Sequence, residues 1–240
     1  MNKDFPKASK YDSEWMKNNM MGPNSVHLLE RLADKMDLKP GMRVLDLGCG
    51  MGITSIFLAK EFGVQVWATD LWISATDNFN RFIEAGVENT VYPMHSEAHD
   101  LPYADGFFDV VISIDAYHYF GTEKEYLDTY CAKLIKPEGQ IGIVVPGLSK
   151  ELIEGEIPDG LENYWEDDFN TFHSIEWWKK LWDSSNLIEV QHYENMADGK
   201  KIWHESIWKQ GEYGSDFDRE MLRADKTDAL TLVLMTGKKI

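Results

Sequence analysis

The sequence predicts an α/β fold in which a doubly wound, mostly parallel sheet carries helices on both faces. Short apolar runs typical of buried strands alternate with amphipathic stretches between residues 26 and 145. A glycine-rich turn follows the first of these strands, as in sheets that bind a ligand at the carboxyl ends of their strands. The 240 residues suit one domain over 1–240, and no apolar run reaches the roughly 18 residues that cross a membrane.

Periodicity and turn residues set the order of the elements. A turn at 22–25 starts the first helix, and Lys39-Pro40-Gly41 lies beyond its end. Residues 1–21 are polar and expected to be mobile, residues 1–25 are expected to act as a lid, and 147–172 form an insertion over the acceptor site. The expected elements are helix 26–33, strand 43–47, helix 53–59, strand 64–70, helix 74–85, strand 91–95, strand 108–114, helix 123–135, strand 140–145, helix 174–184, and strands 187–193 and 230–235.

The most informative stretch joins strand 43–47 to the helix after it, and it reads Asp46-Leu47-Gly48-Cys49-Gly50-Met51-Gly52. Glycine lets backbone N–H groups approach a ligand without an intervening Cβ. The spacing Asp-x-Gly-x-Gly-x-Gly differs from the pyrophosphate-binding G-x-G-x-x-G pattern. A carboxylate before the turn would repel a pyrophosphate, so we expect a cationic or amine-bearing ligand here.

A second acidic residue ends the next strand, at Asp70. Its offset of about 20 residues suits ribose recognition, because a carboxylate accepts two hydrogen bonds and a ribose diol offers two donors. Ser96-Glu97-Ala98-His99-Asp100 follows strand 91–95, and strand 108–114 ends near Ser113. Taken singly, the glycine turn could be structural, Asp70 a helix N-cap and Glu97 a solvated loop residue.

Together these segments resemble the class I S-adenosylmethionine-dependent methyltransferases over residues 40–146, in particular those that act on small molecules. The resemblance implies a Rossmann-like fold with an antiparallel edge strand, and S-adenosyl-L-methionine as cofactor. Glu97 stands where the family usually has Asp at the adenine edge. The cofactor-binding residues that the resemblance implies are Asp46, Gly48, Cys49, Gly50, Gly52, Asp70, Leu71, Glu97, Ala98 and Ser113.

Candidates for chemistry follow strand 108–114, in Asp115-Ala116-Tyr117-His118-Tyr119. Related enzymes that methylate phosphoethanolamine, glycine and sarcosine contact their substrates here. The phosphoethanolamine enzymes carry a His four residues after the Asp, where this chain has Tyr119 and places His118 one residue earlier. We assign catalytic roles to His118 as a base, Asp115 and Tyr119, with Tyr117 lining the acceptor pocket. His118 could instead support the cofactor loop, and Asp115 could cap a turn.

Aromatic residues are the other unusual feature, with nine tryptophans that include Trp165, Trp177, Trp178, Trp182, Trp203 and Trp208. Aromatic faces beside carboxylates suit an ammonium group, which makes Trp165 a candidate substrate-binding residue. Tyr11 and Trp15 are candidates for the same role, folded over the site from the N-terminal segment. The alternative is that these rings only fill the packing between helices and sheet, and that the N-terminus is an unanchored tail.

A formal net charge of −17 without a basic stripe argues against nucleic acid as a substrate and disfavours anionic membranes. Cys49 and Cys131 lack metal-ligand or disulfide spacing, so we expect no metal and a cytoplasmic location. The N-terminus lacks the apolar core of a signal peptide. The sequence leaves the oligomeric state open, with a homodimer as one alternative.

Three functional hypotheses follow. The first is S-adenosylmethionine-dependent methylation of a small molecule at an amine nitrogen, by in-line transfer. The second is C- or O-methylation of a phenolic or quinone-like acceptor, as in relatives from the ubiquinone and menaquinone pathways. The third is a cofactor-binding module without catalysis, which would lack a cavity reaching the methyl group.

Overall fold

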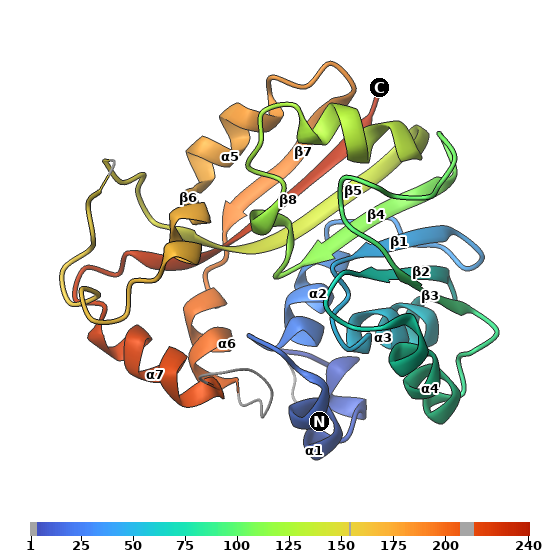
Figure 1. Cartoon of the computed structure of the whole chain (residues 1–240), viewed down its shortest axis with the longest axis horizontal. Coiled ribbons are helices and arrows are strands. Elements are labelled where there is room, and N and C mark those ends of the chain that lie inside the picture. Colours follow the sequence, from blue (N-terminus) through green and yellow to red (C-terminus); the bar gives the residue numbers. More distant parts are fainter. Residues whose placement is uncertain (1–3, 154, 207–213) are drawn as a thin grey trace.

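The computed structural model describes residues 4–153, 155–206 and 214–240 and centres on one mixed sheet. The strand order is β3-β2-β1-β4-β5-β8-β7, and the short β6 pairs with β5. Strands β1 to β6 pair in parallel, whereas β8 pairs antiparallel with both β5 and β7. Figure 1 shows the sheet crossing the molecule, with the N-terminal segment beside α2 and α3. The doubly wound, mostly parallel sheet with an antiparallel edge is therefore confirmed.

The elements have the following bounds. The strands are β1 (Arg43–Leu47), β2 (Gln65–Asp70), β3 (Val91–His95), β4 (Phe108–Ile114), β5 (Ile135–Leu148), β6 (His173–Ser174), β7 (Ile188–Asn195) and β8 (Leu230–Lys239). The α-helices are α1 (Ser13–Asn19), α2 (Ser25–Ala33), α3 (Ile53–Phe62), α4 (Ala75–Ala85), α5 (Ile175–Trp182), α6 (Gly199–Glu205) and α7 (Gly214–Ala224). Single helical turns occur at Ala8–Lys10, Tyr117–Tyr119, Leu127–Cys131, Ala132–Leu134 and Asp167–Thr171.

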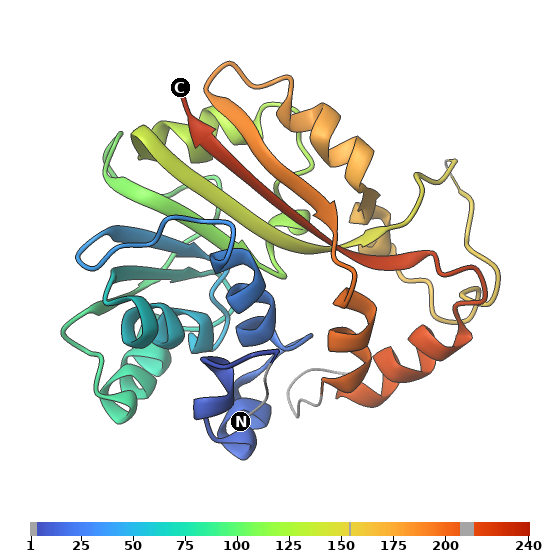
Figure 2. The same cartoon turned by 180° about the vertical axis from the view of Figure 1, so that it is seen from behind.

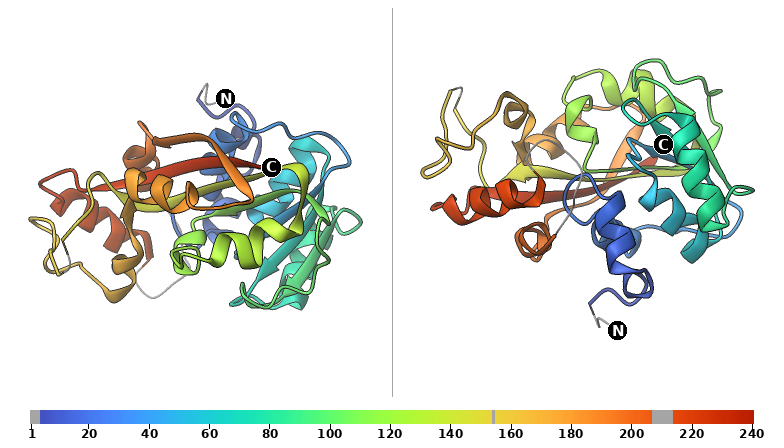
Figure 3. Two further views of the ribbon diagram at one scale, coloured as in Figure 1. Left: turned by 90° about the horizontal axis from the view of Figure 1, so that it is seen from above. Right: turned by 60° about the horizontal axis from the view of Figure 1, so that its bottom comes forward.

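Each face of the sheet has its own apolar core, because successive side chains of a strand point to opposite faces. Val44 and Ile112 face the core formed with α2, α3 and α6. Their neighbours Leu45 and Val111 face the core that contains Trp178 and Trp182 of α5. Figures 2 and 3 show helices on both sides of the sheet. Burial on both faces explains why the strands read as continuous apolar runs in the sequence.

Local structure differs from the sequence prediction in three places. The helix expected over 123–135 is reduced to a π turn at Leu127–Cys131 and a 3-10 turn at Ala132–Leu134, because Ile135 already pairs with β4. Strand β5 therefore begins five residues earlier than expected and includes a positive φ of 65° at Glu138. Helices α6 and α7 were not predicted, whereas Ser174 caps α5 as expected, accepting a hydrogen bond from the Trp177 N–H.

The N-terminal segment is anchored, and the expectation of a mobile tail over 1–21 was wrong for its described part, from residue 4. The buried Glu30 carboxylate of α2 accepts hydrogen bonds from the backbone N–H groups of Lys7 (2.9 Å) and Ala8 (2.8 Å). Apolar side chains between the polar positions, at Phe5, Met16 and Met20, enter the same core as α2 and α3.

Across the described ranges, none of the helices has the length and apolar character needed to cross a bilayer.

Replacement of Glu30 by Gln tests this anchor. One carboxylate oxygen that accepts a backbone N–H becomes an NH2 donor facing that N–H, so unfolding should become easier by about 1–3 kcal/mol. Urea unfolding measures the change, and the exposed Glu125→Gln serves as control because Glu125 lies at the surface. An unchanged unfolding midpoint for Glu30→Gln would show that the segment is held by other contacts.

Candidate functional site

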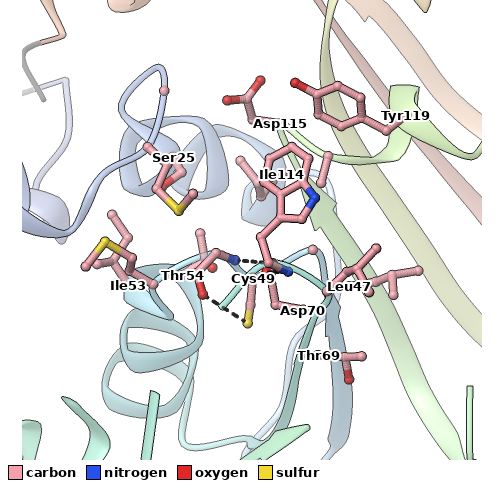
Figure 4. Close-up of a pocket in the computed structure, with 18 of the residues that line it drawn as sticks. Ser25, Leu47, Cys49, Ile53, Thr54, Thr69, Asp70, Ile114, Asp115 and Tyr119 are labelled. Carbon is pink, nitrogen blue, oxygen red and sulfur yellow. Dashed lines mark hydrogen bonds between the residues drawn. The ribbon is translucent and has the colours of Figure 1, made fainter. Parts of the chain in front are cut away.

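A cavity that is open to solvent lies at the carboxyl ends of β1, β2, β3 and β4. The segments after these four strands and the chain that leads into α2 form its walls (Figure 4). The lining residues are Asn19, Met20, Met21, Gly22, Pro23, Ser25, Leu47, Gly48, Cys49, Gly50, Met51, Ile53, Thr54, Thr69, Asp70, Leu71, Trp72, Ser96, Glu97, Ala98, Ile114, Asp115, Ala116, Tyr119 and Phe120.

The glycine turn brings the end of β1 against the chain that follows β4. Gly48 adopts a φ of 76°, and a Cβ at this position would lie 2.3 Å from the Ala116 Cβ. Its N–H donates to the Thr69 carbonyl at the end of β2 (2.8 Å), as does that of Cys49 (3.1 Å). The turn is therefore fixed to both neighbouring strands, and its tight fit next to Ala116 requires glycine.

Asp70 holds together the two turns that face the cavity. Its Oδ2 accepts the Gly50 N–H (2.8 Å), and its Oδ1 accepts the N–H groups of Trp72 (2.8 Å) and Ile73 (2.9 Å). A carboxylate offers about four lone-pair sites, so roughly one remains for a ligand hydroxyl. Asp70 therefore mainly holds the backbone of the two turns, and it can also accept a hydrogen bond from one ribose hydroxyl.

Asp46 lies behind the glycine turn and does not line the cavity. Its Oδ2 accepts hydrogen bonds from the hydroxyls of Thr54 and Ser55, both at 2.6 Å, whereas its buried Oδ1 has no partner among the described residues. Burial raises the pKa of Asp46 to about 6 against the opposing effect of these two hydroxyls, and the Asp70 charge adds to the rise. An unsatisfied buried oxygen at this point fits a ligand that brings a donor or a positive charge.

Two further residues that the resemblance implied, Gly52 and Ser113, lie behind the residues that line the cavity. Gly52 caps α3 and faces Phe82, whose ring would be 2.6 Å from a Cβ there. The Ser113 hydroxyl donates to the Leu47 carbonyl (2.7 Å) and ties β4 to β1. The cavity itself is lined by Gly48, Cys49, Gly50, Asp70, Leu71, Glu97 and Ala98. Burial raises the pKa of the Cys49 thiol, which argues for a small packing residue rather than a nucleophile.

Asp115 and Tyr119 line the opposite end of the cavity, as predicted, and Figure 4 shows their polar groups near each other. Asp115 has a positive φ of 57°, and burial, with the Asp218 charge, raises its pKa to about 8. Burial and the charges of nearby carboxylates, Asp115 foremost, raise the pKa of Tyr119, so its phenol stays protonated. The Trp72 ring lies 5.4 Å from that of Tyr119 at an angle of 63°.

His118 and Tyr117 do not line the cavity, and their predicted roles need correction. The 3-10 turn at Tyr117–Tyr119 directs its three side chains to different sides. Tyr117 is fully buried against Trp178 and Trp182 on the far face. His118 is 2% exposed, burial lowers its pKa to about 3, and its Nδ1 has no partner in the described structure. It is therefore placed neither as a base at the cavity nor as a hydrogen-bonded support of the cofactor loop.

The expected substrate-binding rings also lie elsewhere. Tyr11 packs on Phe57 and its hydroxyl donates to Glu61 (3.3 Å), and Trp15 stacks on Tyr11 at the outer side of α3. Trp165 packs edge-on against Phe169. No described residue of the insertion 147–172 lines the cavity, although Glu166 and Asp168 act on Tyr119 through their charge. Trp208 and residues 1–3 lie outside the described residues.

Sequence reasoning missed several lining residues. Met20, Met21 and Gly22 lie above the site, and a Cβ at Gly22 would meet the Asp115 Oδ2 at 2.3 Å. The available signal was an apolar pair immediately before the Gly22-Pro23 turn. Trp72 was also missed, although it follows Asp70 by two residues and its side chain is 67% exposed.

The sheet order, the glycine turn and the acidic residues at the strand ends match the fold of the class I S-adenosylmethionine-dependent methyltransferases. Residues 44–139 match the model of a protein family described as a methyltransferase domain. The cofactor of this class is S-adenosyl-L-methionine.

Curated relatives show what the chain is similar to. A glycine/sarcosine/dimethylglycine N-methyltransferase from Actinopolyspora halophila is 32% identical over 136 residues, which are 55% of this chain and 24% of the relative. A 2-methyl-6-phytyl-1,4-hydroquinone methyltransferase from Synechocystis is 28% identical over 198 residues, which are 77% of this chain and 59% of the relative. The chain thus spans less than two thirds of the length of each of these relatives.

Solved structures agree on the fold. The structure of phosphoethanolamine N-methyltransferase 2 from Haemonchus contortus, in complex with S-adenosyl-L-methionine, superposes with a TM-score of 0.68 at 18% identity. The superposition covers 99% of this chain and 58% of the other.

Alanine substitutions at Gly41 and at Gly48 distinguish the effect of the tight fit at the glycine turn from the effect of backbone strain. Gly41 has a φ of 83° with nothing within 4 Å of a Cβ, whereas Gly48 has a φ of 76° and faces Ala116. Gly41→Ala should lose about 1–2 kcal/mol of unfolding free energy because an L-residue is strained there, and Gly48→Ala should lose more because its Cβ would also overlap that of Ala116. Only Gly48→Ala should also lower the affinity for S-adenosylhomocysteine, by about tenfold or more. Urea unfolding and calorimetry measure the two effects; equal affinity in both variants would contradict this view of the turn.

Proposed function

We propose that this protein transfers a methyl group from S-adenosylmethionine to an amine nitrogen of a small molecule. The observation that carries the proposal is the Asp115 carboxylate, which lines the cavity and accepts no hydrogen bond from the part of the chain that the structure describes. It lies at the carboxyl end of β4, next to the glycine turn that suits the cofactor. Non-glycine residues with a positive φ concentrate at functional sites.

The residues at the cofactor end fit this ligand. Bound S-adenosylmethionine would supply an activated methyl group together with its own leaving group. The turn at 48–52 would hold the amino-acid part, Asp70 a ribose hydroxyl, and Glu97 with Ala98 the adenine. The protein then has to align the acceptor and exclude water, which can supply about 7–11 kcal/mol of barrier lowering.

Asp115 can remove the proton that an amine must lose. A protonated amine has no lone pair, so its ammonium must give up a proton before nitrogen forms the new bond to carbon. A carboxylate whose pKa is raised to about 8 is a far better proton acceptor than an ordinary one. Asp115 thus attracts the ammonium and takes its proton, while the phenol of Tyr119 stays a donor.

The aromatic rings beside Asp115 complete a site for a cation. Trp72 and Tyr119 meet at 63°, so together they form a corner at the rim of the cavity. Faces of Trp and Tyr attract ammonium groups by about 0.5–2 kcal/mol each. Because Trp72 follows Asp70 and Tyr119 follows β4, this corner joins the cofactor side to the acceptor side.

Methylation of a phenolic or quinol acceptor is the second candidate, favoured by the apolar lining residues Met20, Ile114 and Phe120 and by the similarity to the hydroquinone enzyme. A binding module without catalysis has less support, because one cavity reaches both the glycine turn and Asp115. The lid role of residues 1–25 remains a proposal, supported by the lining residues between Asn19 and Ser25.

The cellular setting is likewise proposed. The free cysteines Cys49 and Cys131 are buried and suit a reducing cytoplasm. The net charge of −17 argues against nucleic acid as a partner. A homodimer remains a hypothesis that the mass of the protein in solution would test.

A panel of acceptors with radiolabelled cofactor tests the proposal. Secondary and tertiary alkylamines should accept the methyl group, whereas phenols and hydroquinones should not. Binding of S-adenosylhomocysteine, measured by calorimetry, checks the cofactor separately. Methyl transfer confined to phenols or hydroquinones would replace the amine proposal by the second candidate.

Asp115→Asn tests the role of the carboxylate. We expect kcat/KM for the best amine to fall by about tenfold to a hundredfold or more. In the wild type kcat/KM should rise with pH through the Asp115 pKa near 8, because only the ionised form takes the proton. In the variant the rise of kcat/KM should occur at higher pH instead, around the pKa of the amine substrate itself.

The control for Asp115→Asn is a measurement of the free energy of unfolding of this variant. The pKa of Asp115 is higher in the folded than in the unfolded protein, so ionisation costs stability as the pH rises through the folded value. At alkaline pH the variant should therefore be at least as stable as the wild type, and exposed Asp105→Asn should leave kinetics unchanged. A pH profile that is identical in Asp115→Asn and wild type would exclude the base.

A further inference from the structure

In the loop at the adenine end of the cavity, the side chain of a glutamate is held in place by hydrogen bonds. Glu97, which lines the cavity, accepts the backbone N–H of His99 on Oε2 (2.7 Å), and its Oε1 lies 2.8 Å from the Nδ1 of the His99 ring. Each oxygen keeps a further lone pair that can face the cavity. The carboxylate is thus fixed to its own loop, and the longer glutamate side chain needs this restraint more than an aspartate would.

His99 also joins this loop to the segment that follows β4. Its ring contacts those of Tyr126 and Tyr130, at 5.1 Å and 4.9 Å between centroids, and its Nε2 lies 3.4 Å from the Glu123 Oε2. The Tyr126 hydroxyl donates to the carbonyl of Ala98 (3.0 Å), which also lines the cavity. Both loop residues at the cavity wall therefore depend on contacts centred on His99 and Tyr126.

We propose that His99 is a positioning residue of the cofactor site, whose imidazolium fixes Glu97 and the 96–100 loop in the geometry that receives the adenine. The inference rests on the proposed function only in requiring that the cavity binds S-adenosylmethionine. It gives His99 no contact with the reacting atoms.

The charges around His99 give the proposal a pH dependence. The groups that face its ring are Glu97 from its own loop, and Glu123, Tyr126 and Tyr130 from the neighbouring segment. The hydrogen bond with Glu97 raises the pKa of His99, against a smaller effect of burial. Burial would raise the pKa of Glu97, but the hydrogen bonds from the His99 ring and backbone leave it below its usual value. The pair is therefore strongest between the pKa of Glu97 and the pKa of His99, and it weakens as the pH rises through the pKa of His99.

The chain offers a matched control in a second histidine–glutamate pair. The Oε1 of Glu151 lies 2.6 Å from the His173 Nδ1, its Oε2 accepts the Ser174 N–H (2.8 Å), and the His173 ring stacks on Trp177. Neither residue lines the cavity. His173→Ala therefore removes a comparable pair without touching the adenine end.

Calorimetry with S-adenosylhomocysteine tests the inference on the whole protein. His99→Ala should weaken binding roughly three- to tenfold while His173→Ala leaves it unchanged. In steady-state kinetics the KM for S-adenosylmethionine should rise by the same factor, with kcat unchanged at saturating cofactor. His99→Gln, which keeps a donor but no charge, should lose the decline of affinity that the wild type shows as the pH rises through the pKa of His99.

Three results would distinguish a failure of the positioning role of His99 from a failure of the proposed function. Affinity unchanged in His99→Ala, or reduced equally in His173→Ala, would overturn the positioning role while leaving the cofactor site intact. If His99→Ala does not fold, an identical pH dependence in His99→Gln and wild type would overturn it instead. A wild-type protein that binds no S-adenosylhomocysteine would refute the proposed function itself.

Discussion

The close approach of Gly48 to Ala116 is the constraint on which the site depends. Strands β1 and β4 are neighbours, and the turns after them meet so tightly that a Cβ at Gly48 would overlap that of Ala116. This contact sets the glycine turn and Asp115 on two sides of one cavity. Asp70 adds the third wall, because its carboxylate ties Gly50 to the turn that carries Trp72. A methyl donor and its acceptor need such fixed proximity.

The sequence was sufficient for the sheet and the cofactor end because both depend on local patterns. Strands β1 to β4 agree with their predicted bounds within a residue, and most of the implied cofactor residues line the cavity. Side-chain direction in the turn after β4 was not predictable in this way. Tyr117, His118 and Tyr119 are consecutive, yet one enters the core under α5, one packs against Phe172, and one faces the cavity. Their directions follow from a 3-10 turn whose packing partners come from distant segments.

The N-terminal segment shows the same limit. Its polar composition suggested a loose tail, but Glu30 and Glu61, both remote in sequence, bind Lys7, Ala8 and Tyr11. These partners direct Tyr11 and Trp15 to the outer side of α3 and leave Met20 to Gly22 over the cavity. The segment that lines the cavity beside Asp115 is therefore a packed part of the fold, and its fit against Asp115 at Gly22 depends on the absence of a side chain.

Carboxylates with raised pKa values lie near both ends of the cavity. Burial raises the pKa values of Asp46, Asp115 and Asp218, and no lysine or arginine contributes to the shift of any of them among the described residues. Buried carboxylates without a cationic partner destabilise a fold. Asp115 lines the cavity and Asp46 lies behind its glycine turn, so a ligand that carries positive charge suits this site. A sulfonium at the glycine turn and an ammonium at Asp115 would each offset part of this cost. Since a phenol or quinol brings no positive charge, the same reasoning favours an amine as the acceptor.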